Sequence, residues 1–244
     1  MHIGFLGGAR EVGRIGITVK SEKTQVVVDY GVMLDNEPGF PMHVPPKDID
    51  GLILTHSHLD HSGALPIFYI NDKKPLLTNK LNLELSQLLI QDFIHLSGYY
   101  LPFEYLELKS MMRSNQHLDF GQEATWGDMK IKLVNAGHTP GSAQVLIEAD
   151  GKRFLYTGDF NTEESKLLAG ASMDYGDLDA VVIESTYADS DHTERSELER
   201  QFVESCKAVV EVGGTVLVPS FGVGRAQEMA CILAANKFDY PSTL

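Results

Sequence analysis

The segment THSHLDH at residues 55–61 constrains the chain more than any other stretch. It holds three histidines and one aspartate directly after an apolar run. In an extended segment, side chains two residues apart point the same way, so His56 and His58 share a face. If a helix then begins, Asp60 and His61 project from its first turn toward a neighbouring point. A solvated histidine-rich loop is the alternative, but four ligand groups at the end of a buried strand favour two adjacent metal sites of zinc type.

Two other segments supply what such a pair of sites lacks. His138 lies in a turn, GHTPGS, and Asp159 lies in a second turn, TGD, each after a predicted strand. Alone, either is only a turn signal. With the histidine cluster they provide a ligand from a distant strand and a bridging carboxylate. Asp29 ends another predicted strand, and we interpret it as a residue that orients a histidine rather than as a direct ligand.

The balance of charges limits how this chain can bind nucleic acid. Its 244 residues include 20 basic and 34 acidic side chains, which give a net charge of −14. This argues against a wide basic surface that binds nucleic acid by counterion release alone. It does not argue against an enzyme whose metal ions contact phosphate, because the formal charge omits bound ions.

The composition is that of an ordinary globular protein, with 43% hydrophobic and 22% charged residues. No apolar run approaches the roughly 20 residues needed to cross a bilayer, and the N-terminus lacks the features of a signal peptide. Cys206 and Cys231 show neither a disulfide framework nor the CxxC spacing of zinc sites. We therefore expect no membrane contact and a cytoplasmic location.

The first part of the chain is predicted to combine short strands with helices. Two β-rich runs at residues 15–19 and 25–29 predict an antiparallel hairpin. Helices are predicted at residues 59–70 and at residues 79–97, where leucines recur at helical spacing. Further strands are predicted at residues 51–55, 130–135, 143–148 and 153–157. This order predicts sheets that pack on each other and are covered by helices.

The pattern changes after about residue 175. Apolar strands at residues 180–184 and 215–219 alternate with helices at residues 194–212 and 224–236. Strand–helix alternation with continuous apolar strands predicts a parallel sheet covered on both faces. Two strands make a poor domain, so we expect the chain to be cut short within its second domain.

Together these motifs resemble the metallo-β-lactamase superfamily and, within it, the β-CASP nucleases. The superfamily resemblance rests on the HxHxDH motif, followed in order by His138 and Asp159. The β-CASP resemblance rests on residues 7–13 (GGAREVG), 184–187 (ESTY) and 219–228 (PSFGVGRAQE). It is closest to archaeal relatives of RNase J and of the nuclease subunit that processes mRNA 3′ ends.

The resemblance implies an α/β fold in two parts. Residues 1–177 would form a metallo-β-lactamase αββα sandwich, and residues 178–244 would form the first part of a parallel-sheet β-CASP domain. The family's motif B and motif C histidines lie further along, and no histidine follows His192 here. We therefore expect this length of chain to have weak or no turnover.

The resemblance also implies roles for single residues. One zinc ion would be held by His56, His58 and His138, a second by Asp60 and His61, and Asp159 would bridge the two. Two residues would act in catalysis. Asp60 would also align the attacking water, and Glu184 would orient a histidine near the leaving group.

The function implied is a zinc-dependent ribonuclease with two ions per complete active site, acting on single-stranded RNA. We favour a 5′→3′ exoribonuclease of the RNase J type, and a homodimer is one assembly that the resemblance allows. The alternatives are an endoribonuclease of mRNA 3′-end processing or transcription termination, a catalytically silent RNA-processing subunit, and a hydrolase of thioesters or lactams. Ser220 and Arg225 flank a predicted helix start and are candidate RNA contacts, unless Arg225 forms a structural ion pair.

Overall fold

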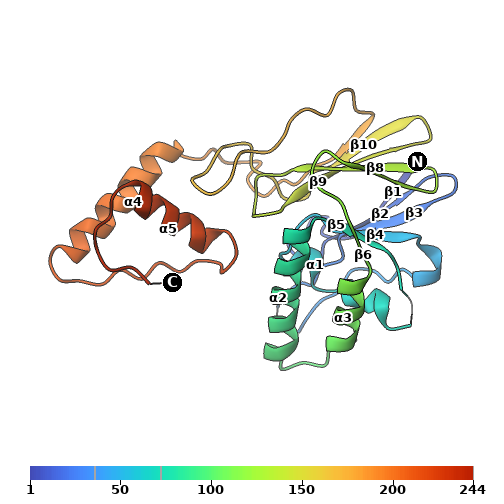
Figure 1. The fold of residues 1–244 in the computed structure, drawn as a ribbon, viewed down its shortest axis with the longest axis horizontal. Coiled ribbons are helices and arrows are strands. Elements are labelled where there is room, and N and C mark those ends of the chain that lie inside the picture. The colour runs from blue at the N-terminus through green and yellow to red at the C-terminus, as the bar shows by residue number, and fades with distance from the viewer. Residues whose placement is uncertain (36, 72, 244) are drawn as a thin grey trace.

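The computed structural model describes residues 1–35, 37–71 and 73–243. Two β-sheets lie face to face, and two helices cover the outer side of one of them (Figure 1). Two more helices, near the C-terminal end, lie beside this sandwich. The predicted α/β class and the predicted packing of sheet on sheet are confirmed.

The first sheet has six strands in chain order and changes from antiparallel to parallel partway across. Its strands are β1 (His2–Gly7), β2 (Gly16–Lys20), β3 (Gln25–Val28), β4 (Gly51–Ile53), β5 (Leu76–Thr78) and β6 (Asn115–His117). β1, β2 and β3 pair antiparallel, which confirms the predicted hairpin, whereas β3 to β6 pair in parallel. Because β3 and β4 are parallel, the chain leaves both strands at the same edge of the sheet.

The second sheet has five strands and is antiparallel except at one edge. Its strands are β7 (Glu123–Trp126), β8 (Met129–Asn135), β9 (Ala143–Ala149), β10 (Lys152–Tyr156) and β11 (Ala180–Val182). β7 to β10 form a meander, and β11 pairs with β10 in parallel. The three strands predicted around residues 130–157 are therefore confirmed.

Apolar cores lie on both faces of the first sheet. In β3, Val26 and Val28 pack into the core between the sheets, whereas Val27 packs into the core under the helices. In β4, Ile53 packs into the core between the sheets, and Leu52 packs into the core under the helices. Side chains buried on both faces explain why these strands are continuous apolar runs in the sequence.

The helical layer on the first sheet consists of α2 (Lys80–Leu96) and α3 (Tyr105–Arg113), and the short 3₁₀ helix η1 (Pro46–Asp48) lies between β3 and β4 in the chain. The predicted helix at residues 79–97 is confirmed. Asn79 caps α2 by accepting a hydrogen bond from the Asn82 N–H at 2.9 Å. Its side-chain amide donates to the Gly141 carbonyl at 2.6 Å, which ties the start of α2 to the turn after β8.

The single helix predicted at residues 59–70 is wrong in extent. The chain instead forms α1 (Leu59–Ser62), one turn long, and then the 3₁₀ helix η2 (Leu65–Tyr69). The His61 carbonyl accepts from the Tyr30 N–H at 2.8 Å, in the segment after β3, instead of continuing a helix. Pro66, which lacks an N–H, is the second residue of the 3₁₀ helix that follows.

The second part of the chain contains two helices, α4 (Arg195–Val210) and α5 (Arg225–Ala235), as predicted. The prediction of a strand at residues 215–219 is wrong, because these residues form no strand. The other strand predicted for the second part is present as β11, but it pairs with β10 of the second sheet. The described residues therefore contain no separate parallel sheet in the second part. Leu217 is 88% exposed, and a strand needs a neighbour to pair with. The boundary between residues 177 and 178 stays a prediction. None of the described helices is both long and apolar enough to span a membrane.

Gly31 provides a test of how tightly the first sheet is joined to α1. A Cβ atom at this position would lie 1.6 Å from the Asp60 carbonyl oxygen, so any larger residue displaces that backbone. We expect Gly31→Ala to lower the free energy of unfolding by about 1–3 kcal/mol, the usual cost of overpacking, measured by chemical denaturation. Gly98→Ala is the control, since nothing lies within 4 Å of its Cβ position. Equal stability of the two variants would contradict this packing.

Candidate metal centre

Four strand ends, from both sheets, bring the predicted site residues to one edge of the sandwich. His56 follows β4, which ends at Ile53, and Asp29 directly follows β3. From the second sheet, His138 follows β8 and Asp159 follows β10. The two sheets stack with these strand ends at a common edge, so residues that are far apart in the sequence meet there.

One group of candidate ligands consists of His56, His58, His138 and Asp159, whose ligand atoms all lie within 4.8 Å of one another. His58 Nδ1 is 3.2 Å from His56 Nε2 and 3.3 Å from His138 Nε2. Asp159 Oδ2 is 3.8 Å from His56 Nε2 and 3.6 Å from His138 Nε2. Ligands on 2.0–2.2 Å bonds in a tetrahedral zinc site lie about 3.3–3.6 Å apart, so this spacing fits a metal ion.

A second group, Asp60, His61 and Asp159, lies beside the first and shares Asp159 with it. His61 Nε2 is 3.3 Å from Asp159 Oδ1 and 3.8 Å from Asp60 Oδ2. The two oxygens of Asp159 thus face different groups, which is the arrangement expected of a bridging carboxylate. The structure brings together all six predicted ligands, and their roles stay predictions.

Asp29 lies in neither group, but its carboxylate contacts Thr55 and His61. Its carboxylate is fully buried and accepts from the Thr55 N–H at 2.8 Å and from the Thr55 hydroxyl at 2.7 Å. It also lies 2.8 Å from His61 Nδ1. With φ of 57°, Asp29 adopts the left-handed conformation, which is uncommon for a residue other than glycine. Such an orienting contact leaves His61 Nε2 turned toward Asp60 and Asp159.

The protonation of the ligands follows from burial and from the carboxylates around them. Burial lowers the pKa values of His56, His58 and His138 below the ordinary value, so these rings are neutral at pH 7 and keep a lone pair for a metal ion. Burial also opposes charge on His61, but Asp29 and the hydrogen bond to Asp159 outweigh it and hold the pKa of His61 well above its usual range.

The carboxylates of this edge stabilise positive charge. Burial favours the neutral form of Asp159, but the hydrogen bond from His61 outweighs this effect and lowers the pKa of Asp159 to about 2. Buried imidazole nitrogens and carboxylate oxygens are the donor set that zinc takes in proteins. The residues present therefore fit a pair of metal ions.

Glu184 lies close to this edge through the turn that carries Asp159. Its carboxylate accepts from the Phe160 N–H at 3.5 Å and from the Thr186 N–H at 3.1 Å. Its negative charge also reaches His138, on whose pKa it exerts a small raising effect. The structure therefore places Glu184 as a support of the Asp159 turn, and its catalytic role stays a prediction.

Ser220 and Arg225 flank the start of α5 and are both exposed. Within residues 1–35, 37–71 and 73–243, Arg225 makes no ion pair. The structure therefore does not support the alternative of a structural ion pair. Their contact with RNA stays a prediction.

Sequence reasoning missed three residues that support the site. Thr55 joins Asp29 to His56, whose Nδ1 lies 3.1 Å from the Thr55 hydroxyl. Tyr156 is buried, and burial, together with the negative charge of Asp29, holds the pKa of its hydroxyl well above the usual range. Thr55 lies within the THSHLDH segment and Tyr156 directly precedes the TGD turn, and these positions were the one signal in the sequence.

The third missed residue, Glu228, joins the second part of the chain to the first. Its buried carboxylate accepts from the Lys166 N–H at 3.0 Å and the Leu167 N–H at 2.8 Å, and it pairs with Arg195 of α4. Glu228 is the last residue of the PSFGVGRAQE motif, but the sequence alone does not show this contact, since a glutamate in a helix is usually solvated.

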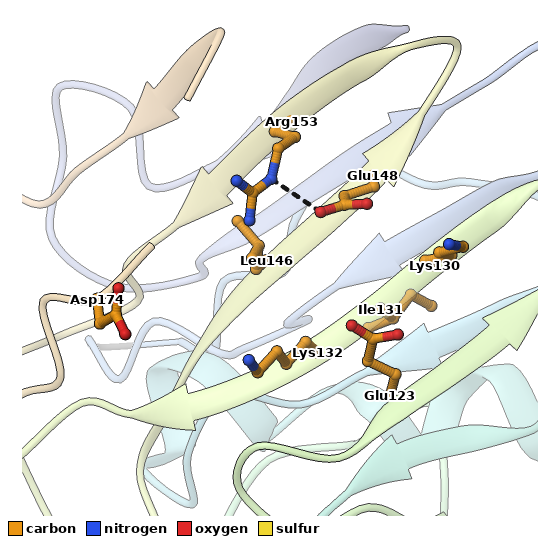
Figure 2. Close-up of a pocket in the computed structure, with 8 residues that line it drawn as sticks. All are labelled: Glu123, Lys130, Ile131, Lys132, Leu146, Glu148, Arg153 and Asp174. Atoms are coloured by element: carbon orange, nitrogen blue, oxygen red, sulfur yellow. Dashed lines mark ion pairs between the residues drawn. The ribbon is translucent and has the colours of Figure 1, made fainter. Parts of the chain in front are cut away.

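A pocket lined by charged residues lies elsewhere, on the outer face of the second sheet (Figure 2). Lys130 and Lys132 flank Ile131, which packs between the sheets, so the two lysines point outward. Arg153 Nε pairs with Glu148 at 2.8 Å across the same face. Because basic and acidic groups alternate there and none belongs to the metal groups, this pocket is not part of the site.

Comparison with known families agrees with the geometry. The profile of the metallo-beta-lactamase superfamily matches residues 17–220. This range includes every residue of the two metal groups.

Curated relatives carry names of ribonucleases. "RNase aCSPSF2" of Saccharolobus solfataricus is 37% identical over 241 residues, which cover 97% of this chain and 49% of the relative. "Probable RNase MJ4" of Methanocaldococcus jannaschii is 36% identical over 249 residues, covering 99% of this chain and 58% of the relative. The chain thus spans about half the length of the curated relatives it matches.

A solved structure supports the fold alone. A protein of unknown function from Enterococcus faecalis superposes with a TM-score of 0.56 at 15% identity, covering 84% of this chain and 57% of that one.

The Asp29 network gives a prediction about stability. We expect Asp29→Ala to lower the free energy of unfolding by about 3 kcal/mol or more, because three buried donors lose their acceptor and each costs about 1–3 kcal/mol. Urea denaturation measures the change. The exposed Asp92→Ala on α2 is the control, expected within about 0.5 kcal/mol of the parent. A loss below 1 kcal/mol for Asp29→Ala would refute the network's importance.

Proposed function

The chain belongs to the metallo-beta-lactamase superfamily, and from that premise we propose that it carries the metal site of a zinc-dependent ribonuclease. The observation that carries the proposal is the pair of ligand groups that share Asp159. The names of the relatives support RNA as the substrate, and the motifs at residues 7–13, 184–187 and 219–228 support the β-CASP branch.

In this proposal each candidate ligand has a defined place. His56, His58 and His138 would hold one zinc ion, Asp60 and His61 would hold the other, and Asp159 lies where it could contact both. Such ions would supply a lowered pKa of bound water and positive charge against the phosphate oxygens.

The chain's own residues prepare the site for this chemistry. Asp29 accepts the Nδ1 proton of His61, so that the Nε2 atom faces Asp60 and Asp159. Asp60, whose side chain is about one-third exposed (35%), accepts a hydrogen bond from the attacking water and aligns it with the phosphorus. Glu184 holds the Asp159 turn in place through the Phe160 N–H.

The proposed reaction is hydrolysis of single-stranded RNA to a 5′-phosphate and a 3′-hydroxyl, proceeding 5′→3′ as in RNase J. Endonucleolytic cleavage is the alternative, and the experiment below separates the two. The grouping of all six candidate ligands supports an active enzyme over a catalytically silent subunit. The proposal includes a cytoplasmic location, which the free thiols of Cys206 and Cys231 support, and a homodimer, which the family resemblance supports.

Cleavage of end-labelled RNA by the full-length protein tests the function. We expect zinc-dependent loss of nucleotides from the 5′ end of a monophosphorylated strand, abolished by a chelator. Asp60→Ala and His61→Ala should lower the rate by at least about 100-fold, because each removes a group that acts on the reacting water or its metal ion.

RNA binding by both variants, measured with a non-hydrolysable strand, should remain close to that of the parent. Full cleavage activity of either variant would refute the assignment of the site. Internal products from a 5′-triphosphorylated strand would replace the exonuclease by the endonuclease, and a parent that holds zinc but never cleaves RNA would refute the proposed function.

A further inference from the structure

Phe221 places an exposed aromatic ring beside the metal groups. Its ring centroid lies 6.4 Å from that of His58, with 48° between the ring planes. The side chain is 79% exposed, although it comes from the second part of the chain and stands next to the buried edge of the sandwich. Exposed apolar side chains are common on protein surfaces, so it is the position beside His58 that distinguishes Phe221.

Polar contacts of other residues fix the backbone at Phe221. The Gln227 side chain accepts from the Gly224 N–H at 2.7 Å and donates to the Gly222 carbonyl at 2.9 Å. The Phe221 carbonyl accepts from the Ala226 N–H at 3.1 Å. The loop is therefore held without any contribution from the phenyl ring.

Gly224 seats this loop against the turn that carries His138. It has φ of 84°, and its Cβ position lies 3.3 Å from Thr139 Cγ2 and 3.7 Å from Pro140 Cδ. Next along α5, Glu228 binds the backbone of residues 166 and 167. These contacts hold Phe221 at a fixed place above the ligands rather than on a free loop.

Resting on the proposed function, we infer that the Phe221 ring is a stacking surface for the nucleobase next to the scissile phosphate. A phosphate that reaches His58 and Asp159 carries its neighbouring base past the exposed ring. Stacking on an aromatic side chain accepts every base, because each has a π-face.

The charge of the chain makes such a contact valuable. With 34 acidic and 20 basic side chains, the protein has little general attraction for a polyanion. Stacking does not depend on net charge, so it can bind the RNA strand although the overall charge of the protein does not attract it. Of the predicted RNA contacts, Arg225 follows the same loop and would meet the backbone of the stacked nucleotide.

Equilibrium binding of single-stranded RNA to the full-length zinc-loaded protein tests this inference. Removing the aromatic face in Phe221→Leu or Phe221→Ala should weaken binding about 5- to 150-fold, the range of base–aromatic stacking, whereas Phe221→Trp should retain binding. The Leu variant keeps an apolar side chain, so it tests stacking even if the Ala variant folds poorly. Zinc content should stay unchanged, since the ring is no ligand.

Tyr100→Ala is the matched control, because Tyr100 is 93% exposed and lies beyond the end of α2 that is remote from the site. That helix has 17 residues and is about 25 Å long. The control should bind RNA like the parent.

A set of strands that each lack one base locates the contact. One abasic position should weaken binding to the parent by a similar factor and should have little effect on Phe221→Leu, because both changes remove the same contact. Unchanged affinity of Phe221→Leu with a parent that binds and cleaves RNA would overturn this inference alone. Unchanged affinity together with reduced stability would show that the ring packs against protein, and would overturn it too. A parent that binds no RNA would overturn the proposed function as well.

Discussion

The buried carboxylate of Asp29 is the interaction on which the site depends. It joins the end of β3 to the segment after β4 through Thr55, and it fixes His61 through Nδ1. A fully buried charge is costly unless hydrogen bonds compensate it, and three donors do so here. The left-handed backbone of Asp29 turns its carboxylate toward these donors, so local strain supports the position of a ligand.

The parallel pairing of β3 with β4 makes this contact possible. Strands that run in parallel end at one edge, and the second sheet adds His138 and Asp159 at the same edge. The resulting centre has ligand atoms from segments about one hundred residues apart. Its rigidity comes from two cores that bury both faces of the first sheet.

The sequence predicted which residues gather at this edge, because their residue types and order carry the chemistry, and their roles as ligands stay predictions. It also predicted the hairpin of β2 and β3 and the helix α2, where the apolar pattern is clear. It failed at residues 59–70, because the Tyr30 N–H that captures the His61 carbonyl comes from a distant segment. It failed at residues 215–219, because an apolar run forms a strand only beside a partner strand.

The supporting residues show the same limit. Thr55, Tyr156 and Glu228 lie in or beside recognised motifs, but their burial and their partners, which are remote in sequence, are seen only in the structure. Phe221 sits within a recognised motif, but only its distance from His58 shows that it faces the site.

Crystals of the full-length protein grown with zinc test the central claim most directly, through anomalous scattering recorded at the zinc edge. We predict two peaks, one surrounded by His56, His58 and His138 and one beside Asp60 and His61, with a different oxygen of Asp159 contacting each. A single peak, or two peaks that do not share Asp159, would contradict the account of a bridged two-metal centre.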